Sequence, residues 1–479
     1  MMDIPQVARR MCWRLKGLLQ SHLHALTFRL LILYTVCASP TSASSSYILE
    51  EFSDITHLGE FNNMVIHQST GKIYIGAVNR LYLLSETLGL IKPENTGPQE
   101  DYINCLRPFN SCHCKGTDCD KPTLTPCVNK ALLIDYDNQK LITCSNLIQG
   151  HCEKRNLADL SIEEPHRYVP MIPNDRSSPV VMFIAPGPGI ETPTSPRPNV
   201  LYIAATRSLA ESIYKDMVHT ICSRNITTYE LVNDDQFTAT RIEMDVLQKQ
   251  TFRIFYRYGF SSGGFSYFLT VQGKSVTETD IYVSRIVRVC QNDTSFYSYT
   301  EIPLTCTHNN TKYHIVKTAY LGYAGKALAT SLGLPDLPDL RTSEDVLYVI
   351  FNNENPETRH RSDGGSVMCV YTLRDVRRMF TTTIQQCFNG IGNTGPAHIT
   401  KPIPCIQWDD TDNILNDDYC GRHEFNHPIA GIKAVDAEAV IHFPNDSITA
   451  IAVTETYDYT VGFLGTDNGH LKKVGALCI

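Results

Sequence analysis

The sequence has no long apolar run beyond its first 43 residues. A membrane-spanning helix needs about 18–20 consecutive apolar residues, and no later stretch of this 479-residue chain reaches that length. The sequence also has no excess of positive charge, since its formal net charge is −8 at pH 7. This charge argues against nucleic acid and anionic membranes as partners, and it permits a basic protein partner.

Motifs of enzyme chemistry are scarce. Residues 259–263 read GFSSG and match the nucleophile-elbow pattern, but strand-like residues flank Ser261 on both sides, where that motif needs a strand and then a helix. We therefore expect a hairpin tip there. The sequence contains no glycine-rich phosphate loop and no evident set of histidines with carboxylates. These absences favour a binding protein over an enzyme and predict no cofactor.

Two segments have compositions that metal sites can share. Residues 105–127 contain five cysteines and His113, but their spacings do not form the paired Cys-x₂₋₄-Cys units of zinc sites. Residues 409–418 are acidic but lack the glycine turn and final glutamate of a calcium-binding EF-hand. We expect disulfides in the first segment, a solvated acidic loop in the second, and no metal in either.

The first 43 residues have the pattern of a secretory signal peptide. Four basic residues precede an apolar run at 26–38, and small residues offer a cleavage site near 38–43. Removal of residues 1–43 takes away five basic residues and one acidic residue, which lowers the net charge from −8 to −12. The mature chain is thus expected to be more acidic than the full sequence.

Cysteines and sequons indicate an exported protein. Of the 17 cysteines, two lie in the predicted signal peptide and one lies next to the last residue, which leaves 14, an even number, for a disulfide framework. Four Asn-x-Ser/Thr sequons offer glycan acceptors, at Asn225, Asn292, Asn309 and Asn445. Because disulfides persist in oxidising compartments, we predict an extracellular location.

Strand-like runs rich in Val, Ile, Tyr and Thr predict an all-β fold. They begin about 60–80 residues apart, with one gap of about 115, at Gly71, Gln139, Asn199, Phe265, Glu344 and Thr460. This period favours the blades of a β-propeller, in which each four-stranded sheet is covered on both faces by its neighbours. Two stacked β-sandwich domains are the alternative.

The long gap predicts an insertion at about residues 372–427. It begins with TLRDVRRMF at 372–380, which has helical spacing, and continues as an irregular segment. Cys387, Cys405 and Cys420 lie within it. We expect these cysteines to fix an otherwise loose excursion of the chain.

Several segments resemble the sema domain of plexins, most closely that of the A-type plexins. They include IVRVCQNDTSFYSYTEIPLTC at 286–306, FNNMVIHQSTGKIYIGAVNRLYLLS at 61–85, DDYCGRHEFNHPIAG at 417–431 and GFLGTDNGHLKKV at 462–474. The resemblance extends over nearly the whole chain after the signal peptide. It implies a seven-bladed β-propeller with an extrusion from the fifth blade, which agrees with the position of the predicted insertion.

The end of the chain departs from the pattern of this family. Only six blade-like runs precede the last residues, LKKVGALCI. We therefore expect residues 44–479 to be a C-terminally truncated sema domain with an incomplete last blade, as a fragment, a truncated isoform or an incomplete gene model. The later parts of plexins, including the cytoplasmic GTPase-activating region, are not assigned to this chain.

The resemblance also implies disulfide partners. The implied pairs are Cys144–Cys152, Cys290–Cys420, Cys306–Cys369 and Cys387–Cys405. Cys105 is expected to pair with Cys112 or Cys114. The partners of the remaining cysteines stay open, namely Cys114, Cys119, Cys127 and Cys222.

Plexins are cell-surface receptors for semaphorins. The resemblance therefore implies the extracellular ligand-binding part of a receptor in semaphorin–plexin signalling, which acts in axon guidance and cell migration. The implied partner is the sema domain of a semaphorin, and a second receptor molecule is a further candidate. A secreted sema-domain ligand or a soluble decoy is the alternative, and a propeller hydrolase such as a sialidase is a third hypothesis.

Three segments match the ligand-contacting parts of the family. They are residues 206–214, residues 233–237 and residues 401–408. The resemblance implies that Phe237 is an apolar anchor surrounded by charged residues, which suits a protein interface. Core packing is the alternative role of Phe237. The implied charged neighbours are Asp234, Asp235, Arg207 and Lys401.

Overall fold

The computed structural model describes most of the chain after residue 50. The described residues are 51–54, 56, 59–106, 111–112, 122–163, 169–189, 196–210, 212–235, 238–334, 345–358, 365–408, 415–421, 426–456 and 458–475. The predicted signal peptide lies outside them. So do Phe237, the cysteine-rich residues 113–121 and residues 409–414 of the acidic loop.

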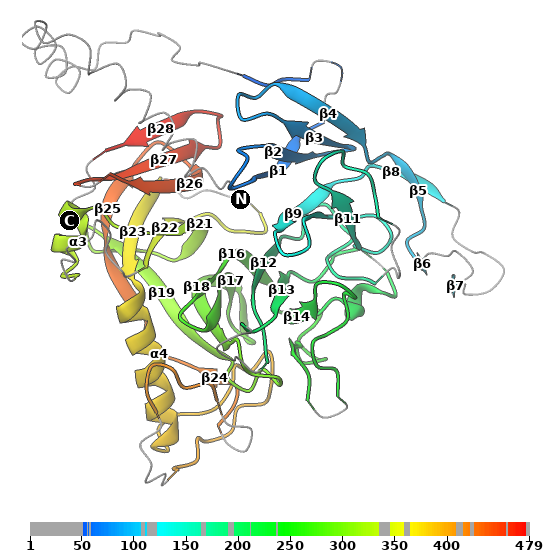
Figure 1. Ribbon diagram of the computed structural model, residues 1–479. Helices are drawn as coiled ribbons and strands as arrows, with labels where there is room; N and C mark the ends of the chain where they lie inside the picture. The colour runs from blue at the N-terminus through cyan, green and yellow to red at the C-terminus, as the bar shows by residue number, and fades with distance from the viewer. Residues whose placement is uncertain are drawn as a thin grey trace, which may run out of the picture.

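Antiparallel sheets follow one another along the described chain, and we call them blades 1 to 6 (Figure 1). Blade 1 contains β1 (Phe61–Ile66), β2 (Ile73–Ala77), β3 (Arg80–Leu84) and β4 (Leu90–Asn95). Blade 2 contains β9 (Asn129–Asp135), β10 (Lys140–Ser145) and β11 (Cys152–Asn156). Blade 3 contains β12 (Val180–Pro186), β13 (Asn199–Ala205), β14 (Ile221–Asn225) and β15 (Arg241–Ile242).

The second half of the chain forms three more blades. Blade 4 contains β16 (Ile254–Ser262), β17 (Phe265–Ser275), β18 (Glu278–Cys290) and β19 (Thr300–His308). Blade 5 contains β21 (Ile315–Gly322), β22 (Val346–Asn352), β23 (Ser366–Thr372) and β25 (Val435–Phe443). Blade 6 contains β26 (Ile448–Glu455), β27 (Thr460–Thr466) and β28 (Leu471–Val474).

Short elements connect or flank the blades. The short strands are β5 (Gln99–Asp101), β6 (Cys105–Leu106), β7 (Ser111–Cys112), β8 (Thr123–Thr125), β20 (Thr311–Tyr313) and β24 (Ile429–Ala430). The helices are the 3₁₀-helix η1 (Lys215–Met217), α3 (Lys326–Ser331) and α4 (Leu373–Phe388). Helix is therefore a minor part of the described chain, as the sequence predicts.

The first strand of each blade packs against the first strand of the next. Strand β1 contacts β9, β9 contacts β12, β12 contacts β16, β16 contacts β21, and β21 contacts β26. The blades are therefore arranged around a common axis (Figure 1). This confirms the predicted β-propeller, and the six blades of the described residues correspond to the six strand-like runs.

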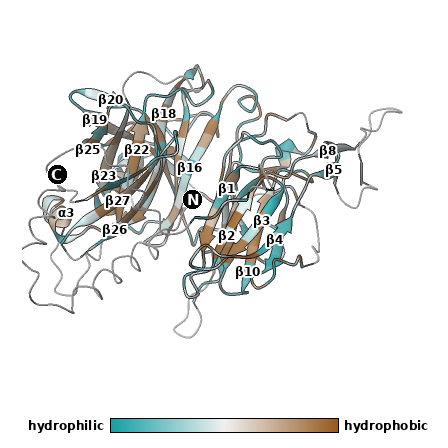
Figure 2. Ribbon diagram, turned by 90° about the horizontal axis from the view of Figure 1, so that it is seen from above, coloured by the Kyte–Doolittle hydropathy of each residue, from teal (hydrophilic) through white to brown (hydrophobic). Residues whose placement is uncertain are grey.

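Burial on both faces explains the composition of the inner strands. All seven residues of β22 and all five of β2 are buried. Two neighbouring sheets cover such strands, so they favour apolar β-branched and aromatic residues without polar alternation. Figure 2 shows β2 as largely hydrophobic, whereas β4, at the outer edge of the same blade, is largely hydrophilic.

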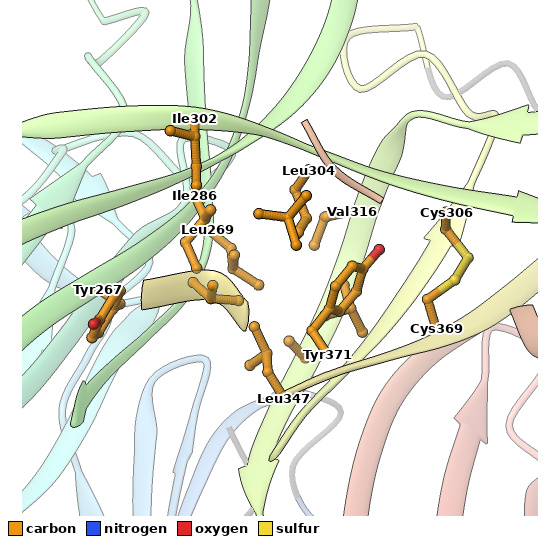
Figure 3. Close-up of a cluster of buried hydrophobic side chains, with 14 of the residues drawn as sticks. Tyr267, Leu269, Ile286, Ile302, Leu304, Cys306, Val316, Leu347, Cys369 and Tyr371 are labelled. Atoms are coloured by element: carbon orange, nitrogen blue, oxygen red, sulfur yellow. A yellow bond between two sulfur atoms is a disulfide. The ribbon is translucent and has the colours of Figure 1, made fainter. Parts of the chain in front are cut away.

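Blades 4 and 5 are also joined edge to edge. Their outer strands β19 and β25 form a parallel pair in which Leu304 lies opposite Val435. The Cys306–Cys369 disulfide links β19 to β23. Beside this disulfide lies a large apolar core that includes Tyr267 of blade 4 and Tyr371 of blade 5 (Figure 3). Backbone, covalent and apolar contacts thus all hold these two blades together.

Disulfides join several of the described cysteines. Among them are Cys144–Cys152, Cys290–Cys420, Cys306–Cys369 and Cys387–Cys405, the same pairs that the resemblance implies. Cys105 is also disulfide-bonded, and it lies opposite Cys112 in the β6–β7 hairpin. Cys127 and Cys222 are buried free thiols. Cys114 and Cys119 lie outside the described residues.

The predicted insertion is confirmed between β23 and β25 of blade 5, and we call its residues 373–434 the extrusion. It begins with α4, after Thr372, whose Oγ1 accepts a hydrogen bond from the backbone N–H of Asp375 at 3.1 Å. Strand β24 then pairs with β19 of blade 4. The Cys290–Cys420 disulfide also connects the extrusion to blade 4, so it rests on that blade (Figure 1).

Candidate functional site

Two of the three predicted contact segments lie in blade 3. Residues 206–214 follow β13 and lead to η1, and residues 233–235 lie between β14 and β15. Arg207 is half-buried, whereas Asp234 and Asp235 are exposed. Since Phe237 is outside the described residues, its role as an apolar anchor stays a prediction.

A chain of ion pairs begins at Arg207. The guanidinium of Arg207 lies 3.0 Å from the carboxylate of Asp216, which lies 3.7 Å from Nζ of Lys249. Lys249 lies 3.9 Å from Glu243, and Glu243 lies 3.0 Å from Nε of Arg241. Positive and negative side chains therefore alternate along one side of blade 3.

The chain of ion pairs ends at Asp234, which pairs with Arg241. His219 adds a contact of 3.2 Å to Glu243. This contact is the main reason that the pKa of Glu243 is lowered, since it outweighs the opposing effect of burial. Exposed ion pairs contribute little stability, but they orient charged groups toward a partner. We call this set the blade 3 strip, defined as Arg207, Asp216, Lys249, Glu243, Arg241 and Asp234.

The third predicted segment, residues 401–408, belongs to the extrusion. Lys401 is exposed. Just before it, the carbonyl oxygen of His398 accepts a hydrogen bond from the N–H of Asp245 at 2.8 Å. The imidazole of His398 stacks on the ring of Phe252, with centroids 4.3 Å apart. The structure thus brings His398, just before the third segment, against the connection between blades 3 and 4.

Exposed apolar residues near Arg207 are a feature that motif matching missed. Leu209, Ile213 and Met217 are 61%, 49% and 46% exposed, whereas Tyr214 is buried. Their spacing of four residues was visible in the sequence, but the segment forms a loop rather than a long helix. The loop is fixed because the hydroxyl of Ser212 donates to Oε1 of Gln149 at 2.7 Å.

The four sequon asparagines are all exposed in the structure. They lie at the end of β14, after β18, in the β19–β20 turn and before β26, and they are Asn225, Asn292, Asn309 and Asn445. A glycosyltransferase needs access to the asparagine amide, and exposure satisfies that condition. Occupancy by glycans stays a prediction.

The GFSSG segment forms the expected hairpin tip between β16 and β17. The hydroxyl of Ser261 accepts a hydrogen bond from Nε2 of Gln291 at 2.7 Å. Within the described residues, no three His, Cys, Asp or Glu side chains gather as metal ligands. No helix there is long and apolar enough to cross a bilayer.

Comparison with known families supports the resemblance seen in the sequence. The Sema domain family matches residues 330–477. Plexin A3 of Danio rerio is 32% identical over 462 residues, which cover 91% of this chain and 23% of the relative. Plexin-A2 of Mus musculus is 32% identical over 435 residues, which cover 87% of this chain and 22% of the relative.

Solved structures give the same result. The extracellular region of plexin A4 superposes with a TM-score of 0.74 at 30% identity, covering 88% of this chain and 45% of that chain. Drosophila Semaphorin 2a superposes with a TM-score of 0.56 at 15% identity, covering 87% of this chain and 66% of that chain, which shows a shared fold alone.

Fold and sequence together define a sema-domain β-propeller. Over most of its length, this chain is similar to A-type plexins. The chain spans less than a quarter of the length of these curated relatives.

Proposed function

We propose that this chain is the extracellular ligand-binding sema domain of a plexin-type cell-surface receptor. Residues 1–43 serve as a signal peptide, and residues 44–479 form one sema domain whose ligand is the sema domain of a semaphorin. The match to the extracellular region of plexin A4 carries this proposal. The disulfides and the exposed sequons support an extracellular location. The role is then in semaphorin–plexin signalling, in axon guidance and cell migration.

The binding surface runs from the blade 3 strip to the extrusion. The strip supplies alternating charges that orient a partner, and Leu209, Ile213 and Met217 supply exposed apolar area beside it. Interfaces of this kind place apolar anchors inside a polar rim. The proposed contact residues are Phe237, Asp234, Asp235, Arg207 and Lys401.

A receptor role is favoured over a secreted ligand or decoy. The chain is 30% identical to the plexin A4 structure and 15% identical to Semaphorin 2a, at TM-scores of 0.74 and 0.56. The semaphorin likeness is one of fold, whereas the plexin likeness extends to the sequence. Association with a second receptor molecule is compatible with this role.

Substitutions on the proposed surface should weaken semaphorin binding. We expect Phe237→Ala to lower the affinity about 30-fold through loss of an apolar anchor, and Lys401→Glu to lower it about tenfold through charge reversal. Surface plasmon resonance against a panel of semaphorin sema domains, with a complete ectodomain carrying each change, measures both effects.

The matched control is Lys473→Glu. Lys473 is exposed in β28 of blade 6, away from blade 3. The Lys473→Glu variant should bind semaphorin with the same affinity as the unchanged protein and be secreted equally well. Unchanged affinity in both surface variants would remove this placement of the ligand.

A further inference from the structure

A cavity of about 330 Å³ lies between blade 4 and the extrusion. Gln272 and Glu301 line it on the blade side, and Phe252 borders it from the connection between blades 3 and 4. His398 and Ile432 line it on the extrusion side. Its volume lies at the small end of the range of about 300–1,000 Å³ for ligand sites, which suits one ring-sized group.

A satisfied carboxylate forms the floor of this cavity. Glu301 is fully buried, and it accepts hydrogen bonds from Nε2 of Gln272 at 3.2 Å and from the hydroxyl of Tyr299 at 2.9 Å. Nε of Arg285 lies 3.3 Å from Oε1 of the same carboxylate. Since the charge of Glu301 is already compensated, the floor does not select a cationic ligand.

The imidazole of His398 is a polar group of the cavity that lacks a hydrogen-bond partner among the described residues. Its side chain is 4% exposed, and its Nε2 has no hydrogen-bond partner among the described residues. The nearest carboxylate oxygen, on Glu301, is 3.9 Å away. Burial lowers the pKa of His398 to about 4, so the ring is neutral at physiological pH. A buried polar atom without a partner is costly, so this atom is suited to a ligand that can hydrogen-bond to it.

Two exposed isoleucines border the cavity, which adjoins the proposed binding surface. Ile391 and Ile432 are 62% and 90% exposed, and both border the cavity. Pro402, next to Lys401, is also part of its wall. Exposed apolar side chains beside a neutral imidazole that can hydrogen-bond fit an aromatic group with a polar tip.

We propose that this cavity is an anchor pocket that receives one tyrosine or tryptophan side chain from a loop of the protein ligand. The ring fills the space beneath Ile391 and Ile432, and its hydroxyl or indole N–H hydrogen-bonds to Nε2 of His398. This inference rests on the proposed function, because the loop belongs to the partner. It adds a specific pocket and side-chain chemistry to the charged surface described above.

Two substitutions test the pocket through protein binding. His398→Phe keeps a ring stacked on Phe252 but removes Nε2, and we expect it to lower the affinity for a bound semaphorin sema domain about fivefold. Ile432→Glu places a charge at the border of the cavity and should lower the affinity about tenfold. The matched control is Leu471→Glu, because Leu471 is 71% exposed in β28 of blade 6; its affinity should be unchanged.

Two small molecules test the pocket without the partner. Saturation-transfer NMR on the whole chain compares p-cresol, the analogue of a tyrosine side chain, with toluene, the analogue of phenylalanine. We expect the chain to prefer p-cresol about fivefold, and we expect His398→Phe to abolish this preference.

The outcomes separate the pocket from the proposed function. If Lys401→Glu weakens semaphorin binding but His398→Phe and Ile432→Glu do not, the pocket inference is overturned and the receptor function stands. If no semaphorin binds the unchanged protein, the proposed function fails. The NMR experiment then decides about the cavity: a p-cresol preference that depends on His398 supports it as a site for aromatic groups, and equal binding of both probes overturns it.

Discussion

Arg288 is a buried cation held by aromatic rings. It lies on β18 and is 1% exposed, with its guanidinium carbon 4.1 Å from the ring centroid of Phe265 and 4.7 Å from that of Phe380. Nε and Nη1 have no hydrogen-bond partner among the described residues. Burial accordingly lowers its pKa. Because Phe380 belongs to α4, this side chain packs the extrusion helix onto blade 4.

Two substitutions of Arg288 should distinguish the contribution of its packing to stability from that of its charge. Arg288→Ala leaves a cavity between two rings and should cost about 3 kcal/mol of unfolding free energy. Arg288→Met fills most of the space without a buried charge and should cost less than about 1 kcal/mol. Urea unfolding followed by circular dichroism measures the free energy of unfolding of both variants. An equal loss in Arg288→Ala and Arg288→Met would show that the cation–ring contacts, and not the filled volume, dominate.

His398 should make stability depend on pH. Its pKa is about 4 when folded, against 6.5 as the ordinary value, so the unfolded chain binds the extra proton first as the pH falls. Stability is therefore lost from about pH 6.5 down to about pH 4, despite the facing carboxylate of Glu301 and because of burial and the nearby Arg285. Between pH 7.5 and pH 5 this loss is about 2 kcal/mol. The free energy of unfolding, measured by urea unfolding at each pH, should fall about 2 kcal/mol less in His398→Phe over this pH range. An equal fall in the variant and the unchanged protein would contradict this prediction.

At the scale of elements, the extrusion is held by covalent and backbone bonds together. Helix α4 packs its buried apolar residues partly against the core of blades 4 and 5 and partly against the rest of the extrusion. Strand β24 extends the sheet beside β19. The rest of the insertion, where the structure describes it, has little regular structure. Such a segment orders few residues through its own hydrogen bonds, so crosslinks carry much of its stability.

Two disulfides that close chain segments of very different length should contribute unequally to the free energy of unfolding. Cys290–Cys420 closes a separation of 130 residues, and Cys144–Cys152 closes one of 8. Loop entropy predicts losses of about 5 and about 2.5 kcal/mol when each pair is replaced by alanines. The secreted yield and the midpoint of urea unfolding of each double variant show which disulfide contributes more. Equal losses would indicate that the extrusion is held mainly by α4.

At the scale of the whole molecule, the propeller places distant segments on one surface. Residues 206–217 and 233–241 come from blade 3, whereas His398 and Lys401 come from an insertion in blade 5. The extrusion passes over blade 4, and His398 contacts Asp245, which is two residues after Glu243 of the blade 3 strip. The candidate surface is therefore a product of the ring, since no single blade contains it.

The sequence by itself determined the strand-rich blades, the insertion at 372–427 and the cysteine pairs, through local patterns and a family resemblance that remain visible along one chain. The pattern of apolar residues predicts strands from neighbouring positions alone, and matching family motifs indicate which cysteines pair. The ion-pair chain from Arg207 to Asp234 and the cavity around His398 were decided only by the tertiary structure. Both depend on side-chain distances across blades, and blade-to-blade packing sets those distances with no mark in the local sequence.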